Sequence, residues 1–240
     1  MKLIVILMLL PFVLMSQEDS GLVTRNRPGL FWFFNGSRPI QDADSRKYDR
    51  CIVEITHNEW FGDLNVFQNK WNSLGYHFSL NKDIQLKSTN RVTFGIGMGY
   101  SYLNHTLDRV FFNTQHQSVD TELPSPTDSM IYSKLTIHQF YIPLELRLKS
   151  LGWKHVKLIL GTRIGIQPWV FSKSLYKENG IEQYYEQKLQ DVGWFYSTVY
   201  ARFGIRNWSI VGLFHPMKLF NSDESLRLYP FQIGISLSLF

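Results

Sequence analysis

A recurring alternation of apolar and polar residues constrains this chain more than any other feature. In residues 92–102, apolar or aromatic side chains alternate with threonine, glycine and serine. A repeat of two residues is typical of a β-strand, because successive side chains point to opposite faces. No segment shows a convincing helical period. Seven further segments alternate, the first and the sixth of them more weakly: 51–58, 74–81, 138–149, 156–166, 195–205, 208–215 and 231–239. The sequence therefore predicts an all-β protein of about eight strands.

The connections between these segments alternate in length. The odd-numbered connections are long, and each exceeds the short connections beside it. An up-and-down antiparallel transmembrane β-barrel has short periplasmic turns at one rim and longer extracellular loops at the other. A soluble β-sandwich has no physical reason to alternate in this way. We therefore expect residues 51–240 to form an outer-membrane barrel with both chain ends on the periplasmic side. The expected connections are 59–73, 82–91, 103–134, 150–153, 167–191, 206–207 and 216–228.

Composition supports this interpretation and excludes several classes of protein. The chain is 15% aromatic, yet its mean hydropathy is close to zero, which is typical of strands with one face in lipid and one in water. The lone Cys51 excludes an internal disulfide framework. The formal charge of +5 is spread along the chain, without a basic block that would indicate nucleic acid. The seven histidines lack the spacing of a metal site, and no cofactor motif is present, so we expect neither a metal nor a cofactor.

The N-terminal residues read as a targeting segment. One lysine at position 2 precedes an uncharged apolar run from Leu3 to Met15, followed by a small residue, Ser16. This layout predicts a signal peptide at residues 1–16, too short to span a bilayer as a helix. Residues 17–50 are mixed in character, and the sequence leaves open whether they form a periplasmic tail, a plug or an additional strand.

Charged residues on the polar side of the strands predict what fills the barrel. An eight-stranded barrel is narrow, and its interior is filled by side chains. We expect a lumen charge cluster in which Glu145 lies among Arg147, Lys157 and Arg163. Arg202, on a later strand, has the same parity and belongs to the same predicted cluster. Solute diffusion through such a lumen is not expected.

Tyrosine and tryptophan gather near the predicted strand ends. Membrane barrels carry girdles of aromatic residues at both interfaces of the bilayer. We expect the following residues to form such girdles: Trp60, Trp71, Tyr102, Trp153, Trp169, Trp194 and Tyr229.

Residues 70–76, 95–101 and 141–147, together with the last strand, resemble the small outer-membrane barrels of Bacteroidetes. This is the broad porin-like group that includes the PorT-type barrels, and the likeness covers residues 51–240. The resemblance implies recognition by the barrel-assembly machinery through the last strand. Phe240 shares the parity of Ser238, whereas the usual signal places the terminal aromatic residue with the lipid-facing side chains. The implied C-terminal assembly signal comprises Phe231, Ile233, Ile235, Leu237, Leu239 and Phe240.

The function expected from these observations is structural or interactive, not enzymatic. The partners are then the outer-membrane bilayer and proteins that contact loops 103–134 and 167–191, with an accessory role in envelope secretion as one option. One alternative is an outer-membrane lipid hydrolase that uses His77 and Ser79, which share one strand face. Nucleophilic catalysis also needs an orienting residue and an oxyanion site, and the sequence assigns neither. A second alternative is a soluble periplasmic β-sandwich that binds a ligand and buries its apolar parity beneath a second sheet.

Overall fold

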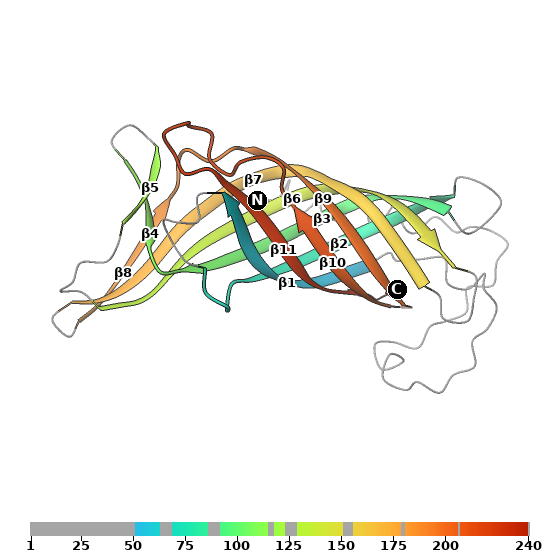
Figure 1. Cartoon of the computed structure of the whole chain (residues 1–240), viewed down its shortest axis with the longest axis horizontal. Coiled ribbons are helices and arrows are strands. Elements are labelled where there is room, and N and C mark those ends of the chain that lie inside the picture. Colours follow the sequence, from blue (N-terminus) through green and yellow to red (C-terminus); the bar gives the residue numbers. More distant parts are fainter. Residues whose placement is uncertain are drawn as a thin grey trace, which may run out of the picture. The chain divides into compact units, whose positions relative to one another are not determined.

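The computed structural model describes residues 51–62, 69–85, 92–114, 118–122, 129–150, 156–178, 181–205 and 207–239. Eight antiparallel strands form a closed barrel, in which each strand pairs with its neighbours and β1 pairs with the last strand, β11. Figure 1 shows this wall of tilted strands. The barrel strands are β1 (Cys51–Gly62), β2 (Leu74–Gln85), β3 (Val92–Leu107), β6 (Ser129–Lys149), β7 (Val156–Glu178), β9 (Phe195–Ile205), β10 (Trp208–Phe214) and β11 (Leu228–Ser238). The predicted all-β barrel of eight strands is therefore confirmed.

The two rims of the barrel differ as the sequence predicts. One rim, here called the turn end, carries the short connections 86–91, 150–155 and 206–207, as well as the start of β1 and the end of β11. The other rim, the loop end, carries the four long connections. The predicted signal peptide, residues 17–50 and Phe240 lie outside the described residues.

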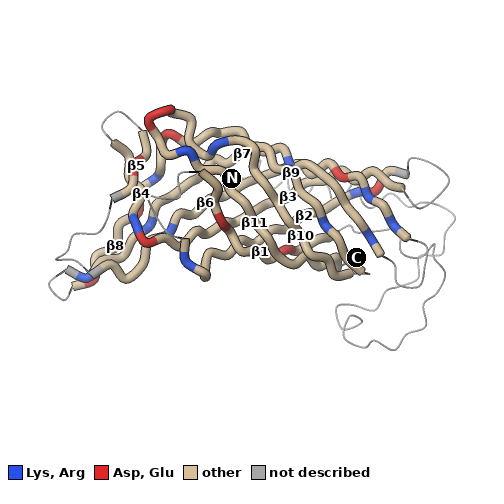
Figure 2. The backbone as a smooth tube through the Cα atoms, in the orientation of Figure 1, with Lys and Arg blue, Asp and Glu red and all other residues tan. Residues whose placement is uncertain are grey.

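The outer face of the wall is apolar and the inner face is polar. On β9, burial alternates strictly, with Phe203 59% exposed and its neighbour Arg202 1% exposed. Charged residues lie mostly towards the strand ends, which leaves much of the wall uncharged (Figure 2). Soluble proteins rarely expose so large a continuous apolar surface, so the pattern indicates a lipid-facing wall. Each strand contributes one or more exposed residues, such as Ile55, Phe78, Met98, Ile142, Ile164, Phe203, Ile210 and Ile235.

This polarity is the reverse of what the β-sandwich alternative requires. A sandwich would bury the apolar parity between two sheets. In the described strands, that parity faces outward and the polar parity lines the interior. The sandwich alternative is therefore wrong.

Three further strands lie at the loop end, where the sequence predicts loops. β4 (Val110–Asn113) pairs with β5 (Val119–Glu122) in a small separate sheet. β8 (Ile181–Lys188) pairs with residues 171–178 of β7, the half of that strand at the loop end. The loop bounds 103–134 and 167–191 are accordingly wrong, because β3, β6 and β7 run well into both ranges.

A register shift explains why the alternation predicts too short a β7. Between β6 and β7 the pairing slips at His138 and Phe140, so that Gln167 and Pro168 together oppose one residue of β6. Such a bulge moves the inward position from odd to even numbers. Gln167 faces inward before the bulge, and Val170 faces inward after it. The period-two pattern therefore ends at the bulge although the strand continues to Glu178.

The residues predicted for the aromatic girdle divide into exposed and buried side chains. Trp71, Trp169 and Trp194 are exposed. Trp60 is 2% exposed and instead stacks on His105 inside the barrel, with ring centroids 3.9 Å apart. Trp60 shares the parity of Glu54, Thr56 and Asn58, which is the inward parity of β1, so its assignment to the girdle is wrong. Trp153 lies outside the described residues.

Candidate functional site

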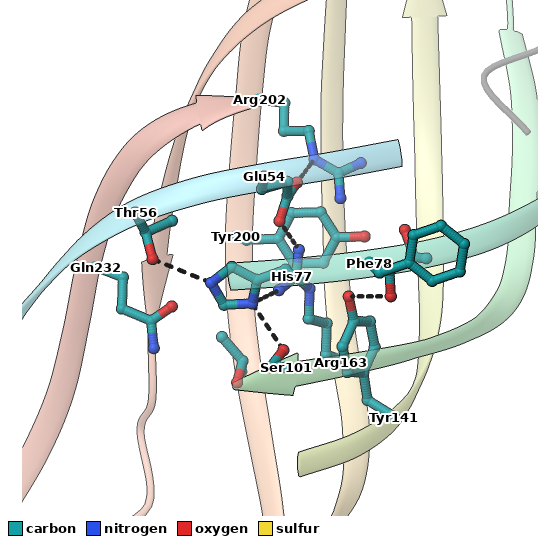
Figure 3. A network of polar contacts seen from close by, with 12 residues as sticks. Glu54, Thr56, His77, Phe78, Ser101, Tyr141, Arg163, Tyr200, Arg202 and Gln232 are labelled. Atoms are coloured by element: carbon teal, nitrogen blue, oxygen red, sulfur yellow. Dashed lines mark hydrogen bonds and ion pairs between the residues drawn. The ribbon is translucent and has the colours of Figure 1, made fainter. Parts of the chain in front are cut away.

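Ion pairs between buried residues fill the lumen near the turn end. Glu54 on β1 accepts hydrogen bonds from Arg163 Nη2 and Arg202 Nε, each at 2.5 Å. Both arginines reach Glu54 from the opposite side of the barrel, on β7 and β9. Figure 3 shows Glu54 between the two guanidinium groups. One carboxylate thus ties together strands that are far apart in the sequence.

A second carboxylate, Glu145 on β6, extends this network. Its Oε1 accepts hydrogen bonds from Arg202 Nη1 at 2.8 Å and from the Tyr200 hydroxyl at 2.5 Å. Its Oε2 accepts a hydrogen bond from Arg147 Nε at 2.6 Å, and Arg147 also pairs with Asp83 on β2. The chain of contacts therefore runs from Asp83 to Arg163 across five strands.

Opposite charges and ring contacts hold this network together, and Lys149 joins its edge at 3.7 Å from Asp83. The carboxylates Asp83, Glu54 and Glu145 face three guanidinium groups, all of them buried. The Arg163 guanidinium also lies over the rings of Tyr141 and Tyr200, at 4.6 and 4.8 Å from their centroids. Buried charges are tolerated when they are paired and hydrogen-bonded, and they become costly when one partner is lost. The network therefore joins strands on opposite sides of the barrel through buried side chains.

The structure assigns different partners to the predicted lumen residues. Glu145 lies beside Arg147, and Arg202 joins both carboxylates. Arg163 pairs with Glu54, and the Lys157 ammonium donates to the Ser238 hydroxyl at 2.8 Å. The predicted grouping of Glu145 with Lys157 and Arg163 is thus replaced by a set of pairs.

Two acidic members of the network are missing from the sequence prediction. Glu54 lies in the weakly alternating segment 51–58, where it shares the parity of Thr56 and Asn58. That parity is the one signal that could have placed it inside. Asp83 lies two residues beyond the predicted end of its strand, at an inward position of β2 that continues the parity of His77, Ser79 and Asn81.

His77 belongs to the same buried region, and its ring forms hydrogen bonds with residues other than Ser79. Its Nδ1 lies 2.7 Å from the Ser101 hydroxyl and 3.1 Å from Arg163 Nη1, and its Nε2 lies 3.0 Å from the Thr56 hydroxyl. Ser79 is also buried, and its hydroxyl accepts a hydrogen bond from Asn81. Both ring nitrogens of His77 thus have partners other than Ser79 (Figure 3).

Between the ion pairs and the loop end, the interior of the barrel contains neutral polar groups. The Gln139 amide donates to Gln167 at 3.1 Å, and Gln167 donates to the Gly193 carbonyl at 2.7 Å. His215 lies 3.2 Å from the Thr198 hydroxyl and stacks on the Tyr196 ring. The lumen thus passes from charged to neutral polar side chains along its length.

An apolar cluster fills the loop end. Wall residues such as Leu103 meet Phe111 and Val119 from the β4–β5 hairpin, and Leu219 and Phe220 from the connection 215–227. Every residue of the cluster is at most 3% exposed. Backbone bonds hold the connections in place, including Gly193 N to Leu219 O at 3.1 Å. The loops therefore fold into a cap with its own core.

Shortening a buried side chain of the cap should substantially lower the free energy of unfolding. Phe220 is fully buried and contacts the Phe111 ring, with centroids 6.0 Å apart. We expect Phe220→Ala to reduce the free energy of unfolding by about 3–5 kcal/mol, as for other buried phenylalanines. The control is Met217→Ala in the same connection, where the side chain is 47% exposed. Denaturant unfolding in detergent, followed by tryptophan fluorescence, measures both; equal effects of the two changes would contradict a packed cap.

At the loop end, β6, β7 and β8 form a sheet, here called the projecting sheet, which contributes Leu135, Ile137 and Val170 to the apolar cluster. It comprises residues 129–138 of β6, 169–178 of β7 and all of β8. Figure 1 shows these strands reaching past the rest of the wall. On β8, Ile181, Tyr184 and Tyr185 are 66%, 52% and 54% exposed. The loop end therefore presents an exposed aromatic strand.

Side chains of the projecting sheet interact with one another across β7 and β8. The Tyr184 hydroxyl donates to Glu186 at 2.7 Å, which raises the pKa of Tyr184 to about 12. The same bond, with a contribution from Lys173, lowers the pKa of the Glu186 carboxyl. Glu186 is therefore an anion at neutral pH and a partner for Lys173 at 3.2 Å.

No protein-family model matches this chain, and no curated protein matches it. Among solved structures, the chain is similar to Ail, the attachment invasion locus protein of Yersinia pestis, at 10% sequence identity and a TM-score of 0.38. The match covers 78% of this chain and 95% of the Ail chain. A likeness this distant says nothing about activity or partner. Within the described part of the chain, no helix is long and apolar enough to cross a bilayer, and no group of three or more potential ligand residues could hold a metal ion.

Proposed function

We propose that this chain is an outer-membrane β-barrel that acts without catalysis, as a membrane anchor for an interaction surface at its loop end. The exposed apolar band around all eight strands supports the membrane location, since lipid is the environment that stabilises such a surface. The long connections then face the outside of the cell, and the turn end, with the start of β1 and the end of β11, faces the periplasm.

The filled interior supports a role other than transport. The ion-pair network and the apolar cap occupy the lumen at different heights, and both consist of buried side chains. The same burial supports a non-enzymatic role. His77 and Ser79 point into this interior, away from the lipid that a hydrolase of membrane lipids would act on.

The projecting sheet is the observation that carries the interaction role. An exposed edge strand can add a strand from another polypeptide through main-chain hydrogen bonds. β8 pairs with β7 along one edge, and no described strand pairs with its other edge. At the end of that strand, the Asn113 side-chain amide donates to the Lys188 carbonyl at 2.9 Å. The proposed partner is a protein that binds along β8.

Two finer roles belong to this proposal. Residues Phe231, Ile233, Ile235 and Leu237 lie on the outward side of β11, which suits recognition of this strand by the barrel-assembly machinery during insertion. The resemblance to PorT-type barrels makes components of an envelope secretion system the first proteins to test as partners along β8.

Site-specific photo-crosslinking in living cells tests the interaction surface. A photoreactive phenylalanine analogue replaces Tyr184 on β8 or, as the matched control, Tyr76 on the outer wall of β2. Both tyrosines are about half exposed, at 52% and 46%. We expect protein adducts from position 184 and none from position 76, because Tyr76 faces lipid. Equal adducts at both positions, or none at position 184, would contradict the proposed role of β8.

A further inference from the structure

Two lysines lie directly opposite each other on the projecting sheet. In the pairing of β6 with β7, Lys134 is the register partner of Lys173. Cβ atoms of directly opposed residues are about 4.5–5.5 Å apart, and like charges in such pairs are destabilising. The register therefore places two cationic side chains on adjacent strands and on one face of the sheet.

The charges nearby neutralise only one of the two lysines. The Lys173 ammonium lies 3.2 Å from Glu186, its register partner on β8. Lys134 has no carboxylate within ion-pair distance among the described residues, and its ammonium lies 4.9 Å from the centroid of the Tyr132 ring. Lys177, four residues further along β7, and Lys188, the register partner of Phe171 on β8, lie on the same face as Lys173. With Lys134, this face carries four lysines against two carboxylates, Glu182 and Glu186. The face therefore keeps a net positive charge.

These lysines lie next to a continuous group of aromatic side chains on the outer wall. The His138 ring contacts Trp169 and Phe171 edge to face, at centroid distances of 6.1 and 6.3 Å. The Lys173 ammonium lies 5.6 Å from the centroid of the Phe171 ring. Aromatic girdles on membrane barrels mark the boundary between acyl chains and headgroups. Going along β6 from the apolar band, the order is Ile142, then the aromatic group, then Lys134, so the ammonium groups lie at headgroup height.

We propose that Lys134 and Lys173 bind the phosphate group of an anionic lipid in the leaflet at the loop end. This inference rests on the proposed membrane location. A phosphate carries several strong acceptor oxygens, so one group can accept hydrogen bonds from both lysines. Its negative charge complements the net positive charge of this face. The aromatic group beside the lysines contacts the upper part of the acyl chains of the same lipid.

Native mass spectrometry of the folded protein in a neutral detergent tests this site. The probes are phosphatidic acid, phosphatidylcholine and inorganic phosphate. The test variant is Lys134→Gln/Lys173→Gln. The control is Lys82→Gln/Lys218→Gln, which removes the same charge from β2 and from the connection 215–227. Each lysine near an anionic surface contributes about 1 kcal/mol, so we expect phosphatidic acid to bind the test variant roughly thirtyfold more weakly and the control nearly unchanged.

Each other outcome counts against the site. Equal weakening in both variants, or equal binding of phosphatidylcholine, would show general attraction and not a bound phosphate. Displacement of phosphatidic acid by inorganic phosphate at a similar concentration would assign the site to the free ion. A wild-type protein that folds as a barrel but does not prefer phosphatidic acid contradicts this inference alone. A wild-type protein that remains soluble without detergent contradicts the membrane location as well.

Discussion

Replacement of Glu54 by glutamine should lower the free energy of unfolding of the barrel by about 3–5 kcal/mol. Glu54 accepts hydrogen bonds from Arg163 and Arg202, and all three side chains are at most 2% exposed. Glutamine keeps the size of the side chain and removes its charge. Arg202 still has Glu145 as a partner, whereas Arg163 becomes a buried cation without a carboxylate. Denaturant unfolding in detergent measures the loss.

Two further variants separate the lost charge from a general effect of the substitution. Glu59→Gln makes the same chemical change on β1 at an outward position, where the side chain is 44% exposed and pairs with His57. Exposed pairs contribute little, so we expect a change below about 1 kcal/mol. Adding Arg163→Gln to Glu54→Gln should cost less than the sum of the single changes, because it removes the unpaired cation. Additive losses would contradict the ion pair.

Replacement of Gly165 by alanine should lower stability by about 3 kcal/mol, because the added methyl group has no space. Gly165 faces inward on β7, opposite Tyr141. A Cβ atom there would overlap the Phe140 carbonyl oxygen and lie 2.9 Å from both Tyr141 Cα and Tyr196 Cε1. The first two are backbone atoms of the neighbouring strand, so relief requires β6 and β7 to separate.

Gly212→Ala on β10 is the matched control. A Cβ atom at Gly212 would have no heavy atom within 4 Å. We expect its free energy of unfolding to stay within about 0.5 kcal/mol of the wild type. If Gly165→Ala and Gly212→Ala unfold alike, the close approach of β6 and β7 at Gly165 is not required for the barrel.

The local sequence pattern is sufficient to predict the strands that form the wall of this barrel. Alternation in residues 92–102 and 195–205 predicts both strands and the side that faces lipid. Successive side chains of a strand point to opposite faces, so the apolar residues face lipid and the polar residues face the interior. The length of the connections predicts which rim carries the loops. The pattern fails at Gln167 and Pro168, where the bulge reverses the parity and hides the upper half of β7.

The pairing inside the lumen depends on information that local pattern does not contain. Glu54 and Arg202 are 148 residues apart in the chain. They meet because the stagger of the strands around the barrel brings them to one height, and strand stagger leaves no trace in the alternation of a single strand. Parity thus places Arg163 and Glu145 inside the barrel, but it cannot say that Arg163 pairs with Glu54.

The central claim is that this chain forms a closed barrel in the outer membrane, and heat-modifiability tests it most directly. The membrane fraction is run on a denaturing gel with and without boiling, because a closed barrel of paired strands resists the detergent until it is heated. We predict a band in the outer-membrane fraction that migrates faster before boiling. No shift, with the protein in the soluble periplasmic fraction, would contradict the membrane barrel and with it the proposed function.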